Sequence, residues 1–185
     1  SSAASDVYKR QELMCIIFRL AGNGEYNQPG VLPYVADIEK HFDPFKKHSA
    51  VEMAKNLSKC SGIGFDAPMS LAIHLTAPPE LKERIDFEKY PGSLDERWTI
   101  EMVHNFLNEV RQFVKESDFM KFFQDHQGFY SITLERAQDF VDEEVHLDWF
   151  SSYFGNSAEG KFILALAPNN GGPSYGHNFL SLIHI

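Results

Sequence analysis

One amphipathic segment, residues 93–114, sets the fold class of this chain more firmly than any other feature. Its apolar residues recur every three or four positions and so fall on one face of a helix, namely Trp98, Met102, Val103, Phe106, Val110, Phe113 and Val114. Ser93 and Glu96 form an S-x-x-E pattern before this face, which predicts a capping box at the helix start. The segment is therefore the clearest predicted helix of the chain.

Further helices are predicted on both sides of this segment. The helical spacing of apolar residues places them at 12–22, 33–42, 49–61, 66–76, 117–123 and 131–145. Their ends carry the usual signals. Gly22 and Gly62 occupy C-terminal positions, Pro33 suits a first turn, and Ser49 with Glu52 forms another S-x-x-E box. Asp66 is expected to cap the short apolar helix that follows it.

The pattern changes near the carboxyl end of the sequence. The stretch KFILALA, residues 161–167, is a short continuous apolar run, and Pro-Asn-Asn-Gly-Gly-Pro follows it. This length and punctuation favour a strand over a buried helix, and a second strand is predicted to begin at Tyr175. The predicted fold class is thus α+β and predominantly α-helical, with a helical cluster followed by the first strands of a small, truncated sheet.

The two termini share one origin at the level of DNA. The stretch DVYKRQ can be encoded by GATGTGTATAAGAGACAG, whose reverse complement encodes the terminal LSLIHI. This element resembles the transposase adapter of sequencing libraries, whose usual extension encodes SSAAS. We therefore expect residues 1–11 and 180–185 to be translated adapter that is no part of the natural fold, and residues 12–179 to be an internal portion of a larger domain.

Charge and apolar patterning exclude some partners. The chain has a net charge of -9 and no basic stripe, so its surface repels phosphate backbones and no nucleic-acid partner is predicted. No apolar run approaches the roughly 20 residues that span a bilayer, so no transmembrane segment is predicted either. Cys15 and Cys60 lack CxxC spacing and are expected to be buried free thiols. His74 lies among apolar residues and is expected to be a core histidine.

Two groups of residues are candidates for chemistry. The loop after the predicted strand is rich in glycine and can bring its backbone close to a ligand, which makes Asn170, Gly171, Gly172, Tyr175 and Gly176 a candidate substrate-binding set. The sequence has no HExxH motif and so no complete metallopeptidase zinc site. It has two E-x-x-H motifs, Glu101 with His104 and Glu143 with His146, and di-iron helical bundles use two such motifs. Solvated helix faces are the alternative interpretation of these motifs.

The order of several short motifs resembles a known family. ELMCIIFRLAGNGEYN, GFDAPMSLAIHL, LDERW, DFMKFFQDHQGFY, LDWFSSYFG and NNGGPSYG appear in this order. The same order is found in the bacterial family catalogued as domain of unknown function 4932, whose members are often exported and resemble zinc metallopeptidases. The resemblance covers nearly all of residues 12–179.

The resemblance implies a function for the parent protein. In that family an HExxH-type helix lies downstream of the segment present here, so this portion is expected to lack the catalytic residues and to be inactive alone. The complete protein is expected to bind zinc, to act on a peptide or protein substrate, and to be exported to the periplasm or the extracellular space. Two alternatives from other classes remain, a non-enzymatic binding or scaffold module and a di-iron carboxylate bundle.

Overall fold

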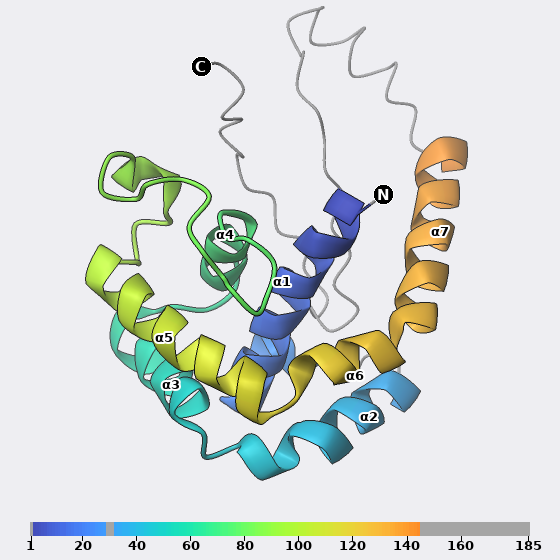
Figure 1. The fold of residues 1–185 in the computed structure, drawn as a ribbon, viewed down its shortest axis with the longest axis horizontal. Coiled ribbons are helices and arrows are strands. Elements are labelled where there is room, and N and C mark those ends of the chain that lie inside the picture. Colours follow the sequence, from blue (N-terminus) through green and yellow to red (C-terminus); the bar gives the residue numbers. More distant parts are fainter. Residues whose placement is uncertain (1, 29–31, 145–185) are drawn as a thin grey trace, which may run out of the picture.

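The computed structural model describes residues 2–28 and 32–144, and these residues form a helical body (Figure 1). Within these ranges the α-helices are α1 Ser2–Leu20, α2 Leu32–Phe42, α3 Ser49–Ser61, α4 Ala67–Ile73, α5 Ile100–Glu116, α6 Phe119–Asp125 and α7 Gln127–Glu144. Short 3₁₀ turns lie at η1 Gly24–Tyr26, η2 Asp43–Phe45 and η3 Pro91–Ser93. The predominantly helical class predicted from the sequence is confirmed.

The predicted sheet is not confirmed. Residues 2–28 and 32–144 contain no strand, and their β pairing is a single antiparallel bridge between Leu75 and Glu83. The predicted strand at 161–167 lies outside the described residues. Helix α1 also runs through the boundary expected after Gln11 without a break, and Tyr8 on its adapter side is buried.

The predicted capping boxes are wrong, although their helices exist. Helix α5 begins at Ile100, because Thr99 has an extended backbone and its side chain accepts a hydrogen bond from the Met102 N–H at 3.2 Å. Ser93 instead ends η3 and donates its hydroxyl to the Tyr90 carbonyl. The apolar period of α5 thus predicted the helix, while the cap depended on where the preceding loop turns.

The N-cap of helix α3 is also displaced, here by one residue. Its N-cap is His48, whose Nδ1 accepts from the Ala50 N–H at 3.0 Å, while the Ser49 hydroxyl donates to Glu109 on α5. Gly62 ends this helix at φ 65°, as predicted. At the start of α4, Asp66 occupies the N-cap position but its side chain makes no capping bond.

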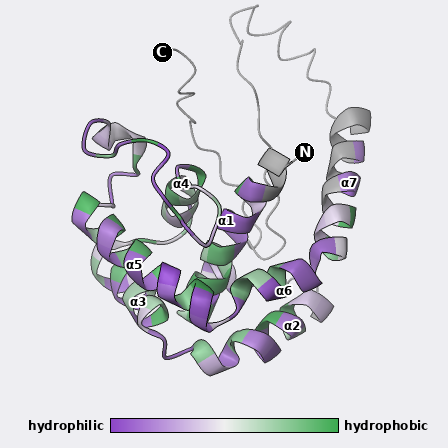
Figure 2. Ribbon diagram, in the orientation of Figure 1, coloured by the Kyte–Doolittle hydropathy of each residue, from purple (hydrophilic) through white to green (hydrophobic). Residues whose placement is uncertain are grey.

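Helix α1 lies at the centre of the body. All six residues at 13–18 are fully buried, and Figure 2 shows hydrophobic residues gathered in this part of α1. Helix α1 packs against α3 and α4, so the sequence LMCIIF is covered on every side. A helix that is apolar all round belongs inside a protein, whereas the spacing of Leu13, Ile16, Ile17 and Leu20 predicted a single apolar face.

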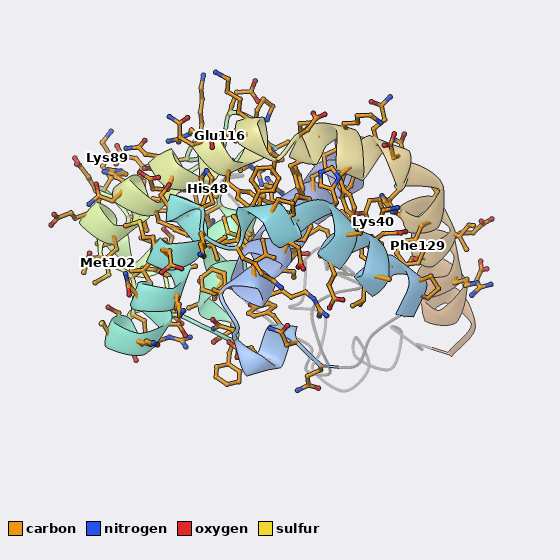
Figure 3. The ribbon with its side chains drawn as sticks, turned by 90° about the horizontal axis from the view of Figure 1, so that it is seen from below. Lys40, His48, Lys89, Met102, Glu116 and Phe129 are labelled. Atoms are coloured by element: carbon orange, nitrogen blue, oxygen red, sulfur yellow. The ribbon has the colours of Figure 1, made fainter. Side chains whose placement is uncertain are left out.

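Helix α5 covers one side of this core and packs against α3 and α6. Its predicted apolar face is buried at Val103, Phe106, Val110, Phe113 and Val114. Outside the core, the His48 Nε2 lies 3.3 Å from the Glu116 carboxylate across the seam between α3 and α5, where Figure 3 labels both residues. Helix α7 extends from α6 along the edge of the body (Figure 1).

Cys15 and His74 lie in the core, whereas Cys60 lies at the surface. Neither cysteine forms a disulfide; Cys15 is buried as predicted, but Cys60 is exposed because it faces outward from the last turn of α3. His74 is fully buried at the end of α4, and its ring meets the edge of Phe87 at a centroid distance of 6.2 Å. The core position predicted for His74 is confirmed.

Candidate functional site

A buried carboxyl group on α1 is bonded to tyrosines from two other helices. The Tyr34 hydroxyl on α2 donates to Glu12 Oε1 at 2.5 Å, and the hydroxyls of Tyr34 and Tyr130 on α7 lie 2.5 Å apart. Because the Tyr34 proton goes to Glu12, the Tyr130 hydroxyl is the donor in the second bond. These three residues, the Glu12 chain, form one hydrogen-bonded path from α1 through α2 to α7.

The Glu12 chain leaves one polar atom without a partner. Glu12 is fully buried, and among the described residues its Oε2 has no hydrogen-bond partner. No described cation contacts this carboxyl group, although the position next to LMCIIF places it in the apolar interior. A buried polar atom without a partner costs on the order of 1–3 kcal/mol, and more for a charged group.

This environment favours the neutral acid. Burial raises the pKa of Glu12 from 4.5 to about 7, although the hydrogen bond from Tyr34 and the positive charge of His126 both lower it. The same burial, together with the nearby Glu12 carboxylate, raises the pKa of Tyr34 and of Tyr130 well above their usual range. Glu12 can therefore gain or lose a proton near neutral pH, while both tyrosines remain protonated.

Aromatic rings enclose the Glu12 chain on the α7 side. The Tyr34 ring stacks on Phe129 at 4.7 Å, and Tyr130 stacks on Phe123 at 4.3 Å; Phe129 is labelled in Figure 3. His126 lies edge-on to Tyr34 at 5.5 Å and its Nε2 lies 3.1 Å from Asp37 Oδ2. A shallow surface hollow beside it is lined by Asp37, Lys40, His41, Phe122, Asp125 and His126. Glu12 itself has no exposed surface, so it does not line this hollow.

A second polar cluster lies beyond the other end of α1, and we call it the Arg97 junction: Asn23, Glu25, Asp66, Asp95 and Arg97. Arg97 donates through Nη2 to Asp66 at 2.5 Å and through Nε to Asp95 at 2.7 Å. The same guanidinium group reaches the carbonyls of Gly62 and Gly64. Because Asp95 and Asp66 both accept hydrogen bonds from its guanidinium group, the pKa of Arg97 is raised above its usual range.

The Arg97 junction fixes the loop between α3 and α4. Glu25 Oε1 accepts from the Phe65 N–H at 3.0 Å and from Asn23 at 2.9 Å, while the Tyr26 hydroxyl donates to the Phe65 carbonyl at 2.5 Å. Gly64 is required here, since a Cβ at this position would lie 2.6 Å from Glu25 Oε1. The loop is thereby held at both the N–H and the carbonyl of Phe65.

Phe65 is held in an unusual conformation by these bonds. Its φ is 52°, in the left-handed region that non-glycine residues rarely occupy, and its side chain is 56% exposed. The adjacent chain is also anchored, because the Trp98 indole donates to the Ala67 carbonyl at 2.8 Å. The motifs GNGEYN, GFDAPM and LDERW, which are far apart in the sequence, therefore meet at the Arg97 junction.

The site residues proposed from the sequence are only partly described. Asn170, Gly171, Gly172, Tyr175 and Gly176 lie outside the described residues. On α5, Glu101 is exposed, and the half-exposed His104 places its Nε2 2.7 Å from Glu83. Glu143 lies on α7 without a described side chain, and His146 lies outside the described residues, so the paired E-x-x-H site stays a prediction.

The described residues contain neither a metal-ligand cluster nor a membrane-spanning helix. In the ranges 2–28 and 32–144, no three His, Cys, Asp or Glu side chains are grouped so that they could hold a metal ion. None of the helices described there is long and apolar enough to cross a bilayer.

The sequence reasoning missed both the Glu12 chain and the Arg97 junction. One signal for Glu12 was present, because a carboxylate directly precedes the six apolar residues LMCIIF and so enters the core with them. The signal for the Arg97 junction was the motif LDERW, which places two acids beside one arginine. No family model, curated protein or solved structure matches this chain.

Proposed function

We propose that residues 12–179 are the amino-terminal helical part of an exported, zinc-metallopeptidase-like bacterial protein, and that this part supports a catalytic part encoded further downstream. The support for this proposal is the way the motifs of the resemblance assemble. GNGEYN, GFDAPM and LDERW meet at the Arg97 junction, while ELMCIIFRL and DFMKFFQDHQGFY meet at the Glu12 chain. The motifs that carry the resemblance thus contact one another, which is expected if they hold one helical body together.

The described residues supply no zinc site for this function. No group of three ligand side chains lies together in the ranges 2–28 and 32–144, so these residues do not fit a zinc ion. In the proposal, the zinc ligands and the general base belong to the downstream helix that the resemblance implies. The substrate would be a peptide or protein, and the loop with Asn170, Gly171, Gly172, Tyr175 and Gly176 would form a wall of its cleft.

Extending the gene sequence past Phe179 tests this proposal directly. We expect an open reading frame that encodes HExxH downstream, and a purified full-length product that contains about one zinc per chain and loses it when both histidines are replaced by alanine. The present 185-residue chain is the matched control and should contain no stoichiometric zinc. A stop codon, or a long continuation without paired histidines, would overturn the proposal.

A non-enzymatic binding module is the second candidate, and Phe65 favours it. Hydrogen bonds fix its peptide in a left-handed conformation while the ring stays 56% exposed, an arrangement that suits an anchor for another protein. If the full-length protein lacks paired histidines, this candidate replaces the peptidase. Iron in purified, adapter-free protein would instead favour the di-iron bundle.

A further inference from the structure

Among the α7 side chains that the structure describes, the buried attachment to the body runs through the Glu12 chain. Tyr130 is the buried one of these side chains, and its hydroxyl reaches Glu12 only through Tyr34. Phe129 and Thr133 are partly buried, whereas Ile132 is exposed. Tyr130 is therefore the described side chain by which the first turn of α7 reaches the interior of the body, and its hydroxyl is linked through Tyr34 to the Glu12 carboxyl group.

Among the described residues, the titratable groups that face Glu12 come from three helices and one turn. From α1 they are Tyr8 and Cys15, from α2 Tyr34, from α7 Tyr130, and from the turn between α6 and α7 His126. His126 already contacts Asp37 and the Phe122 carbonyl. An ionised Glu12 would thus be a buried anion whose Oε2 lacks any described donor.

We infer that Glu12 is a proton-operated latch for α7, in which the neutral acid holds Tyr34 and Tyr130 in place and loss of the proton to solvent releases the first turn of α7. The physical reason is hydration. Opening the first turn of α7 removes Tyr130 from the Glu12 chain and exposes the chain to solvent, which stabilises the carboxylate, whereas the closed state buries Oε2 without a described partner. The inference holds whether or not the parent protein is a peptidase.

Linkage gives the direction and size of the effect. In the closed state burial raises the pKa of Glu12 from its ordinary value of 4.5 to about 7, and hydration in the open state moves it back toward 4.5, so the closed state binds the proton more tightly and loses this advantage as pH rises through 7. Between pH 5.5 and 8.5 the ratio of open to closed α7 is therefore expected to rise about ten- to thirtyfold.

Hydrogen exchange in the 185-residue chain tests the latch. Protection factors for peptides covering residues 127–133 are measured from pH 5.5 to 8.5 and corrected for the intrinsic pH dependence of exchange. We expect protection there to fall about ten- to thirtyfold, while peptides from α5 change little. In Glu12→Gln, which keeps an acceptor for Tyr34 but does not ionise, the fall should disappear.

Two further variants separate the latch from other causes. Glu135→Gln removes an exposed carboxylate from α7 itself and should leave the pH response unchanged. Tyr130→Phe keeps the ring but not the hydroxyl, so it should lower protection at pH 5.5 and weaken the response. Should Glu12→Gln fail to fold, the wild-type chain still decides, through the ¹³C titration of Glu12 and its α7 protection. A pH-independent wild-type α7 overturns the latch, as does a response that persists in Glu12→Gln, because that response would come from a group other than Glu12.

Discussion

The Arg97 junction and the Glu12 chain join distant parts of one helical body by opposite means. At the Arg97 junction a single cation faces Asp66 and Asp95. Its side chain is 28% exposed, so water still partly hydrates the charged groups. At the Glu12 chain a single acid is fully buried, contacts no described cation and leaves Oε2 without a described partner. The Arg97 junction is therefore held by paired charges, whereas the Glu12 chain is held by hydrogen bonds to an acid that no described cation contacts.

This difference separates a permanent connection from a switchable one. Arginine keeps its charge at every physiological pH, so the Arg97 junction does not depend on pH in the neutral range. Glu12 changes its charge near pH 7, and the strength of its chain changes with it. Glu12, which no described cation contacts, is thus the pH-sensitive connection of the two, because its burial makes the stability of its chain depend on its protonation state.

Removing the cation of the Arg97 junction is expected to have the largest effect. Arg97→Ala deletes the donors to Asp66, Asp95 and the loop carbonyls together and leaves two carboxylates facing each other. We expect a loss of about 3–4 kcal/mol in the free energy of unfolding. Urea denaturation at pH 7 measures this as a lower midpoint with an unchanged slope.

Two controls belong to this prediction. Arg97→Lys keeps the charge but not the planar fork of donors, so about half of the loss should remain. Arg136→Ala removes an exposed arginine from α7 and should change stability by less than about 0.5 kcal/mol. Equal stability of Arg97→Ala and Arg136→Ala would refute the idea that paired charges hold the first region.

The pH dependence of stability gives the next largest effect. The folded state raises the pKa of Glu12 from 4.5 to about 7, so its stabilising contribution is complete below pH 4.5 and is lost as pH rises through 7. Between pH 5 and 8, wild-type stability should therefore fall by about 2–3 kcal/mol relative to Glu12→Gln. Urea midpoints of both proteins across this range measure the difference, and parallel curves would contradict a buried, titrating Glu12.

Sequence predicted the helices of this fold but not their connections. The spacing of apolar residues is local, so α5 and the other helices could be placed from it, and Gly62 could be placed at a helix end because its left-handed backbone is a local requirement. The caps were misplaced because Thr99 and His48 cap their helices through loop conformations that the local pattern does not contain.

The candidate sites were less predictable for the same reason. Glu12 meets Tyr34 across 22 residues of sequence, and Tyr34 meets Tyr130 across 96, so no local spacing joins these three side chains. Only the position of Glu12 against the apolar run LMCIIF hinted at its burial. The motif GFDAPM likewise gave no sign that Phe65 adopts a positive φ, because phenylalanine does not favour that conformation.

The smallest predicted effect concerns that residue and runs in the stabilising direction. Phe65 is 56% exposed, so its ring contributes little burial, while its φ of 52° costs a phenylalanine more than an asparagine. Phe65→Asn should therefore raise the free energy of unfolding by about 0.5 kcal/mol, measured by urea denaturation. Tyr90→Asn is the matched control, since Tyr90 is 49% exposed at φ -128° and has no such strain to relieve.

A gain in stability at residue 65 alone would mean that the Arg97 junction holds an exposed aromatic ring at the expense of stability, which is how a binding residue is expected to behave. A loss would mean that the ring packs against the junction, and it would remove the main support for the binding-module alternative.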